Sequence, residues 1–223
     1  MGIDAKKYKE ILTGLGDKVK LVAVSKTKPV DDIKALYDLG QRDFGENYVQ
    51  EMADKQPQLP QNIHWHFIGH LQSNKIKYIA PFVYMIQGVD SYKLLQEINK
   101  QAKKNQRIIQ CLMQVHIASE ENKFGFNEEE LQHAIHQYKT DDMANIKLVG
   151  LMGMASFTAD QNQLRKEFSY LKIIFDKIKA ILNDDDFSIL SMGMSGDYPI
   201  AVQEGSNMVR IGSLIFGERV YNK

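Results

Sequence analysis

Short apolar runs alternate along this chain with stretches in which apolar residues recur every three or four positions. The short runs are typical of buried strands, and the longer periodic stretches are typical of amphipathic helices. Strands are predicted at residues 20–25, 43–45, 63–69, 85–89, 108–117, 147–154, 187–192 and 208–211. Helices are predicted at residues 5–12, 30–39, 48–55, 72–80, 92–104, 128–138, 164–182 and 199–205. The first helix is expected to end at Gly14 and Gly16.

This alternation predicts the fold. Strand and helix in repeated succession imply parallel strands joined by right-handed crossovers. Eight strands in about 200 residues fit the short end of the range for a (β/α)8 TIM barrel. A doubly wound sheet is the competing architecture, but it usually has fewer strands. We therefore predict an α/β protein with a single (β/α)8 barrel domain over residues 1–223 and an extra N-terminal helix. The weakest strand is 43–45, which is short and polar.

The amino-acid composition limits the kinds of partner that this protein is expected to bind. The 28 basic and 28 acidic side chains give a formal net charge of zero, so no overall attraction to nucleic acid or to anionic membranes is expected. Cys111 is the only cysteine, which excludes an intrachain disulfide and a cysteine-based zinc site and fits a reducing cytosol. The N-terminus lacks the apolar core of a signal peptide, and no apolar run is long enough to cross a bilayer. We expect a cytoplasmic protein.

The first predicted strand is apolar until it reaches Lys26. An amine at the rim of a buried strand can lose hydration, lower its pKa and become a nucleophile toward carbonyl groups. Those are the properties of a lysine that forms a Schiff base. The same segment, Ser25 to Lys28, also fits a solvated turn, because lysines are mostly exposed.

The residues at the carboxyl ends of the predicted strands are polar, whereas the strands themselves are apolar. In a (β/α)8 barrel these ends form the active face, so the contrast favours a functional mouth. Along the chain, the ends carry Lys26, Glu46, Asn47, His70, Asp90, His116, Ser119, Ser156, Ser195, Asp197 and Ser213.

The last two strand ends predict an anion site. Ser195 and Gly196 lead toward a helix that Pro199 helps to begin, and Asp197 or Ser195 can cap that helix. Gly212 and Ser213 follow the eighth strand. Small residues at a helix start offer free backbone N–H groups, and barrel phosphate sites frequently use these two loops. Two ordinary capped turns are the alternative, but their position opposite Lys26 favours a phosphate cradle.

An amine that faces a phosphate cradle across a barrel mouth matches the shape of pyridoxal 5′-phosphate (PLP), which has an aldehyde on one side and a phosphate on another. Arg210 is the candidate partner of the ring nitrogen. Because arginine donates hydrogen bonds and does not give up its proton, it would keep that nitrogen unprotonated and weaken the ring as an electron sink. A salt bridge between Arg210 and an acidic residue is the other interpretation.

Six blocks of sequence resemble the PLP homeostasis proteins, which have the fold of the alanine racemase N-terminal barrel. They span nearly the whole chain, in order, and together they are highly specific. The blocks are VSKTKP (24–29), FGENYVQE (44–51), HFIGHLQSNK (66–75), GLMGMA (150–155), LSMGMSGD (190–197) and VRIGSLIFG (209–217). The resemblance implies a PLP-binding protein without established catalytic activity that keeps free PLP and its relatives in balance.

The resemblance also implies roles for individual residues. Lys26 matches the Schiff-base lysine, Asn47 a residue that lines the pocket, and Arg210 the partner of the pyridine nitrogen. Phosphate-contacting positions match Ser195, Gly196, Gly212 and Ser213. The methionines near the mouth, with Met192 among them, are expected to fill the core and to touch the cofactor ring. His116 departs from the family pattern, in which asparagine is common, and its role is left open.

Two other functions fit parts of the sequence. An amino-acid racemase or decarboxylase on the same barrel would need a second, β-rich domain, and the chain ends a few residues after the last predicted strand. His70, Tyr48 or Lys75 could still supply an acid or base for weak racemisation.

A metal-dependent hydrolase would use His64 and His66 with His70, His116 and Asp90, but these residues are spread between strand starts and strand ends.

The expected role is therefore storage, delivery or buffering of PLP, with apo forms of PLP-dependent enzymes as possible recipients. Neither the recipients nor the oligomeric state, monomer or weak dimer, follows from the sequence.

Overall fold

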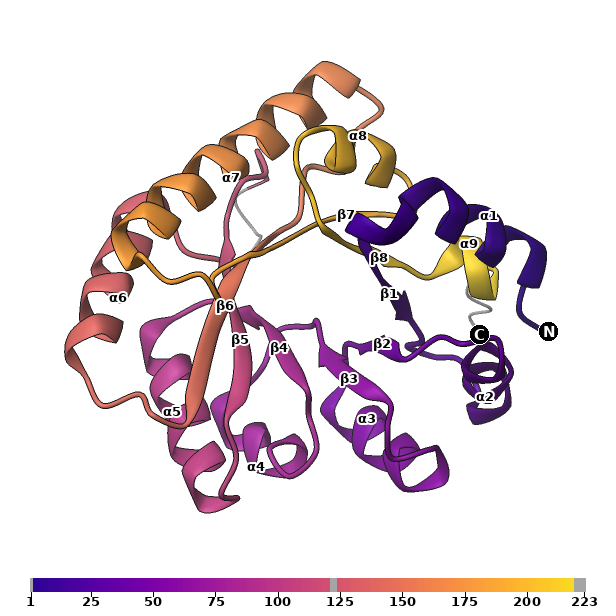
Figure 1. The fold of residues 1–223 in the computed structure, drawn as a ribbon, viewed down its shortest axis with the longest axis horizontal. Coiled ribbons are helices and arrows are strands. Elements are labelled where there is room, and N and C mark those ends of the chain that lie inside the picture. The colour runs from indigo at the N-terminus through magenta and orange to yellow at the C-terminus, as the bar shows by residue number, and fades with distance from the viewer. Residues whose placement is uncertain (1, 121–123, 219–223) are drawn as a thin grey trace.

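The computed structural model describes residues 2–120 and 124–218. Parallel strands close into a barrel in the order of the sequence, because β8 pairs with β1 from Lys20↔Met208 to Ala23↔Ile211. Helices surround the barrel (Figure 1). The strands are β1 (Lys20–Val24), β2 (Asp43–Glu46), β3 (His64–Phe67), β4 (Met85–Val89), β5 (Ile109–Val115), β6 (Ile146–Gly153), β7 (Ile189–Met194) and β8 (Met208–Ile211). The predicted (β/α)8 barrel is confirmed, and so is the short polar strand β2.

The helices also follow the prediction closely. They are α1 (Ala5–Leu15), α2 (Val30–Asp38), α3 (Val49–Lys55), α4 (Ile76–Ile79), α5 (Tyr92–Lys104), α6 (Glu128–Thr140), α7 (Gln161–Leu182), α8 (Tyr198–Gln203) and α9 (Ser213–Phe216). Two details of the prediction were wrong. Helix α1 continues through Gly14 and ends before Gly16, and a 3₁₀ turn at Ser73–Lys75 shortens α4. The four-residue helix α9 was not predicted.

Apolar side chains are buried in two layers, as alternation along barrel strands requires. A small inner cluster fills the barrel and consists of Val22, Met85, Leu112, Val149, Met152 and Met208. A larger cluster lies between the strands and the helices and includes Ala23, Phe44 and Phe67. The neighbours Val22 and Ala23 thus face opposite sides of β1, and side chains that point inward alternate with side chains that pack on helices.

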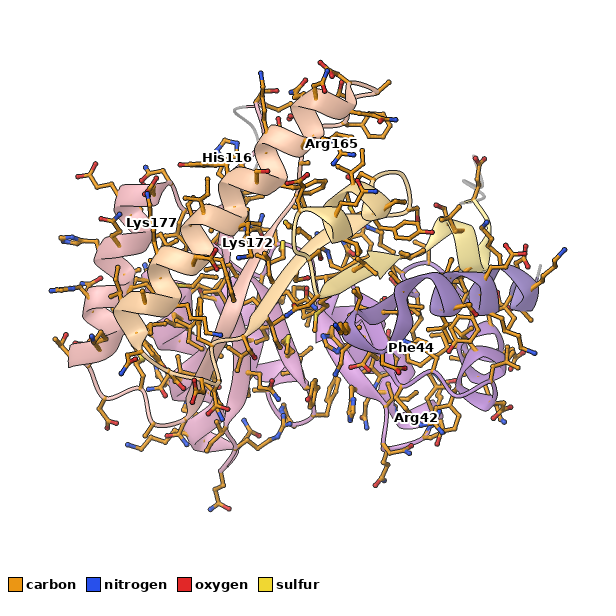
Figure 2. The ribbon with its side chains drawn as sticks, turned by 45° about the horizontal axis from the view of Figure 1, so that its top comes forward. Arg42, Phe44, His116, Arg165, Lys172 and Lys177 are labelled. Carbon is orange, nitrogen blue, oxygen red and sulfur yellow. The ribbon has the colours of Figure 1, made fainter. Side chains whose placement is uncertain are left out.

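Because the strands are parallel, the loops that follow them gather at one end of the barrel. Figure 2 shows His116, which follows β5, and Arg42, which precedes β2, on opposite sides of the molecule. None of the described helices is long and apolar enough to cross a membrane.

The N-terminal helix α1 packs beside α9 (Figure 1). The side chain of Asp4 caps α1 by accepting a hydrogen bond from the backbone N–H of Lys7 at 2.8 Å, and the backbone N–H of Asp4 donates to the carbonyl of Ile215 at 2.8 Å. The hydroxyl of Tyr8 donates to Gln41 at 3.1 Å. Helix α1 thereby supports the segment that follows β8.

Candidate functional site

A cavity of about 480 Å³ opens at the carboxyl end of the barrel. Small-molecule sites usually measure about 300–1,000 Å³. The cavity brings together these residues predicted from the sequence: Lys26, Asn47, Ser195, Gly196, Arg210, Gly212 and Ser213. They come from the ends of β1, β2, β7 and β8, which are neighbours in the closed barrel.

Lys26 lies in a turn that is held on both sides. Before it, the hydroxyl of Ser25 donates to Glu46 at 2.6 Å. After it, the backbone N–H of Thr27 donates to Glu51 at 2.5 Å. Thr27 has a φ of 64°, in the left-handed region that a β-branched residue rarely adopts. This conformation persists only where surrounding contacts hold it, and the contacts of Ser25 and Thr27 do so here.

A buried lysine joins these contacts. The ammonium of Lys55 donates to the carbonyl of Ser25 at 2.9 Å, to Glu46 at 2.8 Å and to Glu51 at 2.6 Å. Burial raises the pKa of Glu46, against the charge and the hydrogen bond of Lys55, which lower it. Strand β2 and helix α3 thus supply two carboxylates and one ammonium that fix the turn around Lys26.

Lys28 also lines the cavity, but its ammonium has a different environment. It donates to the carbonyls of Phe216, Gly217 and Glu218 at 2.8, 3.1 and 3.2 Å. The three carbonyl acceptors match the three N–H donors of the ammonium. Lys28 therefore ties the turn after β1 to the end of α9.

Asn47 carries a polar atom that lacks a partner. Its Oδ1 is buried, and no residue of the described parts of the chain donates a hydrogen bond to it. Gly69 packs directly against the backbone of Asn47. A Cβ at Gly69 would lie 2.4 Å from the Asn47 carbonyl oxygen, so only glycine allows this close contact. A buried polar atom without a partner is costly, and Asn47 faces the cavity, where a ligand could satisfy it.

The loops after β7 and β8 offer backbone donors to the cavity. No acceptor is found within residues 2–120 and 124–218 for the backbone N–H groups of Ser195, Gly196 and Ser213. A Cβ at Gly196 would meet no atom within 4 Å, so a ligand can approach this backbone. The hydroxyl of Ser195 accepts a hydrogen bond from the Gly212 N–H at 3.4 Å and thereby connects the two loops.

The prediction that Asp197 or Ser195 caps the next helix was correct for the position of Asp197 and wrong for its side chain, which makes no capping hydrogen bond to α8. Asp197 occupies the N-cap position of α8, but its carboxylate turns back and accepts from the Met194 N–H at 2.5 Å. Helices α8 and α9 have only six and four residues. The binding of an anion at this place would therefore depend on the N–H groups of the loops and not on the dipole of a long helix.

Arg210 is a buried cation at the inner end of the cavity, with 3 % of its surface exposed. Its Nη1 donates to the hydroxyl of Ser191 at 2.7 Å, and its Nη2 donates to the carbonyl of Gly153 at 3.0 Å. Burial lowers the pKa of Arg210 to about 10, while the negative charge of Asp197 opposes this shift. A guanidinium has five N–H groups, and only two have acceptors in the described residues.

Met192 does not line the cavity, contrary to the prediction that it touches a cofactor ring. It is fully buried in the layer between the strands and the helices. The pairing of β7 with β8 shifts register after Ser191, and Gly193 there has a φ of 96°. This irregularity brings Met194, not Met192, into the cavity wall.

The histidines do not form one site. His66 is fully buried beside Asp43, while His64 stacks on Tyr84 with ring centroids 4.3 Å apart. His70 bonds Asp90 at 2.8 Å. His116 faces the Glu120 carbonyl at 2.9 Å and does not line the cavity, so its role stays open. Within the described residues, no group of three or more His, Cys, Asp or Glu side chains could hold a metal ion.

Sequence reasoning missed part of the cavity wall, which Phe157 and Thr158 complete. They follow Ser156, whose backbone N–H and hydroxyl both donate to the buried Glu167, each at 2.6 Å. The sequence indicated Ser156, because it is a polar residue at the end of a predicted strand. It could not indicate Phe157, because the side chain of Phe157 is fully exposed and carries no group that is typical of a site.

Comparison with known proteins gives consistent matches over the whole barrel. The family model of the alanine racemase N-terminal domain matches residues 5–220. The pyridoxal phosphate homeostasis protein of Pasteurella multocida is 40% identical over 210 residues, which cover 92% of this chain and 88% of that protein. The human protein of the same name is 41% identical over 215 residues, which cover 92% of this chain and 78% of that protein.

Solved structures agree with these matches. PipY of Synechococcus elongatus PCC7942 with PLP bound superposes with a TM-score of 0.88 at 30% identity, over 96% of this chain and 99% of that one. An alanine racemase of Clostridium difficile 630 superposes with a TM-score of 0.78 at 18% identity, over 97% of this chain and 56% of that one. The second likeness shows the fold alone.

Proposed function

Because this chain belongs to the alanine racemase N-terminal domain family and, within it, to the pyridoxal phosphate homeostasis proteins, we propose that it binds PLP in the cavity and takes part in PLP homeostasis. The observation that carries this proposal is the meeting of Lys26, Arg210 and the two glycine–serine loops in one cavity. Relatives that are named for PLP homeostasis, and a PLP-bound structural neighbour, support the choice of cofactor.

The residues present fit PLP in both size and chemistry. The cavity volume suits a small ligand, and the buried Oδ1 of Asn47 lacks a partner among the described residues. The backbone N–H groups of Ser195, Gly196 and Ser213 find no acceptor among the described residues of the protein. They are therefore available to donate hydrogen bonds to a phosphate group. Arg210 can donate to a ring nitrogen but cannot accept from it.

Each of these residues has a separate task in the proposal. When bound, PLP supplies an aldehyde that condenses with primary amines, and Lys26 supplies that amine. The loops after β7 and β8 hold the phosphate, and Arg210 orients the ring from the inner end of the cavity. Asn47 fills the wall between them.

The first test is the site of attachment. After incubation of the protein with PLP and reduction with borohydride, peptide mass mapping should find a phosphopyridoxyl group on Lys26. Lys26→Ala should lose this adduct together with the visible absorption band. An adduct on another lysine would contradict the assignment.

Lys28→Arg is the matched control, because arginine keeps the hydrogen bonds to the carbonyls of Phe216, Gly217 and Glu218. This variant should keep the adduct on Lys26. If Lys28→Arg abolished the adduct while Lys26→Ala retained it, the attachment site would be Lys28.

We further propose that the bound cofactor serves storage, delivery or buffering and not turnover of amino acids. Racemisation needs an acid or base placed on each side of the reacting carbon. The residues that the sequence offered for this task, His70, Tyr48 and Lys75, do not line the cavity, and His70 bonds Asp90 at 2.8 Å instead. The PLP-loaded protein should racemise alanine no faster than free PLP at the same concentration, and faster racemisation would contradict the carrier role.

A further inference from the structure

A chain of hydrogen bonds crosses the interior of the barrel from Arg210 to Asp43. Nη1 of Arg210 contacts the hydroxyl of Ser191 at 2.7 Å, and that hydroxyl contacts Oε1 of Gln87 at 2.7 Å. Nε2 of Gln87 lies 3.0 Å from Nδ1 of His66, whose Nε2 lies 2.9 Å from the Asp43 carboxylate. The five residues belong to β8, β7, β4, β3 and β2.

The two ends of this chain fix the direction of every bond in it. Arg210 can only donate, and an ionised Asp43 can only accept. Burial would raise the pKa of Asp43, but the hydrogen bond from His66 and the positive charge of Lys20 hold this pKa below its usual value. Asp43 is therefore a carboxylate at neutral pH.

His66 is neutral, because burial lowers its pKa against the hydrogen bond and the charge of Asp43, which raise it. A neutral imidazole has one N–H, and the carboxylate of Asp43 requires that it lie on Nε2. Nδ1 of His66 then accepts from the Gln87 amide, and Oε1 of Gln87 accepts the only hydrogen of Ser191. The hydroxyl of Ser191 is left with lone pairs for Arg210.

The middle of the chain is sealed from water. His66, Gln87 and Ser191 have no exposed surface. Asp43 is partly exposed at the amino end of the barrel, where Lys20 lies 3.7 Å and His64 lies 3.4 Å from its carboxylate. Gln87 also approaches the sulfur of Met208 at 3.3 Å. Neither Gln87 nor His66 lines the cavity, so any effect they have on a ligand there must pass through Arg210.

We propose that Ser191, Gln87, His66 and Asp43 are positioning residues, which act as one directed chain to hold the guanidinium of Arg210 in a fixed plane at the inner end of the cavity. This inference rests on the proposed function, in which Arg210 meets the ring of PLP. Ser191 and the Gly153 carbonyl fix two edges of the guanidinium, and its remaining N–H groups are then directed to the ligand.

The first experiment uses the ligand-free protein. Long-range ¹H–¹⁵N spectra of the imidazole rings should show His66 as the neutral tautomer with its proton on Nε2 at neutral pH. Gln87→Met removes the donor to Nδ1 at similar side-chain volume and should shift the Nδ1 resonance toward that of a free imidazole nitrogen. A His66 ring that carries its proton on Nδ1, or on both nitrogens, would overturn the proposed direction.

The second experiment measures PLP binding. Gln87→Met and Ser191→Ala should each weaken PLP affinity by about fivefold or more, which corresponds to the loss of one hydrogen bond of about 1 kcal/mol. Each should also move the midpoint of the pH titration of the visible band, because the contact of Arg210 with the ring changes. Gln87→Met is the more informative variant. Gln87 touches neither Arg210 nor the cavity, so a change in PLP binding would have to be transmitted along the chain of hydrogen bonds.

Ser206→Ala is the matched control. Ser206 is also buried between β7 and β8, but its hydroxyl donates its one hydrogen to the carbonyl of Met192 at 2.7 Å, with the carbonyls of Leu190 and Met208 at 3.3 and 3.0 Å, and it takes no part in the chain. It should lower the melting temperature and leave the affinity and the titration midpoint unchanged.

If Ser191→Ala and Gln87→Met lower only the melting temperature, as Ser206→Ala does, the positioning role is overturned while the proposed function stands. If the unaltered protein binds no PLP, the proposed function fails and the positioning role fails with it.

Discussion

At the scale of single residues, Arg210 shows how a buried charge can be stabilised by neutral acceptors. Its two recorded bonds go to a hydroxyl and a backbone carbonyl, not to a carboxylate. The sequence left a salt bridge open as the other interpretation, and among the described residues no carboxylate lies within bonding distance of the guanidinium. An arginine without a carboxylate partner keeps its charge and its remaining donors available to a ligand.

His66 gives the first prediction, which concerns the dependence of stability on pH. Its pKa is lowered in the folded protein, mainly by burial, whereas in the unfolded chain it is about 6.5. The unfolded chain therefore binds the extra proton, so the free energy of unfolding should fall as pH decreases below about 6.5. One group of this kind contributes at most about 1.4 kcal/mol per pH unit.

Urea unfolding at several values of pH checks this prediction. His66→Gln should reduce the slope of the free energy of unfolding between about pH 5 and about pH 6.5. His133→Gln, at an exposed position of α6, should leave the slope as it is in the unaltered protein. Equal slopes in the unaltered protein and in His66→Gln would show that another group causes the acid sensitivity.

The sequence indicated most residues of the cavity, because they end predicted strands and because they lie in blocks that resemble one family. It could not indicate Gln87 or Ser191 as part of the site. Both lie in the middle of apolar runs, and the two residues, which bond each other, are 104 positions apart in the chain. Met192 was misplaced for a related reason, since a register shift within β7 cannot be read from alternation.

At the scale of elements, the turn between β1 and α2 depends on a helix to which it is not joined. Strand β2 provides Glu46, and helix α3 provides Glu51 and Lys55, which together hold Ser25 and Thr27 on either side of Lys26. Sequence periodicity predicted α3 but not this contact. The acidic and basic residues of α3 looked like those of any solvated helix, and only burial distinguishes Lys55 from the exposed lysines.

Lys55→Met tests this support. It leaves Glu46 as a buried carboxylate without its cation, so the free energy of unfolding should fall by about 3–5 kcal/mol. Adding Glu46→Gln should recover part of the loss, because the unpaired charge is then removed. Lys34→Met breaks an exposed pair with Asp38 on α2 and should change stability by no more than about 0.5 kcal/mol. Similar losses for Lys55→Met and Lys34→Met would contradict the role of the buried pair.

At the scale of the whole molecule, eight parallel strands place residues from both ends of the chain at one mouth. Lys26 follows β1 and Arg210 lies in β8, and the two strands are neighbours because the barrel closes. The alternation of apolar runs was sufficient to predict this closure and therefore the meeting of these residues. It did not predict α9 or its contact with α1, because a four-residue helix has no periodicity to detect. The assignment of residues 1–223 to one domain stays a prediction.

A ligand that joins three fixed points of a rigid barrel should stabilise the whole fold. PLP at about 100 times its dissociation constant should add about 2.7 kcal/mol to the free energy of unfolding, and thermal unfolding should show the corresponding rise in melting temperature. Pyridoxal, which lacks the phosphate, should stabilise less at the same concentration because it leaves the N–H groups of Ser195, Gly196 and Ser213 without an acceptor. Lys26→Ala should retain part of the stabilisation by PLP, since the phosphate loops and Arg210 are intact. Equal stabilisation by PLP and pyridoxal would show that the loops after β7 and β8 do not hold the phosphate, even if Lys26 is the attachment site.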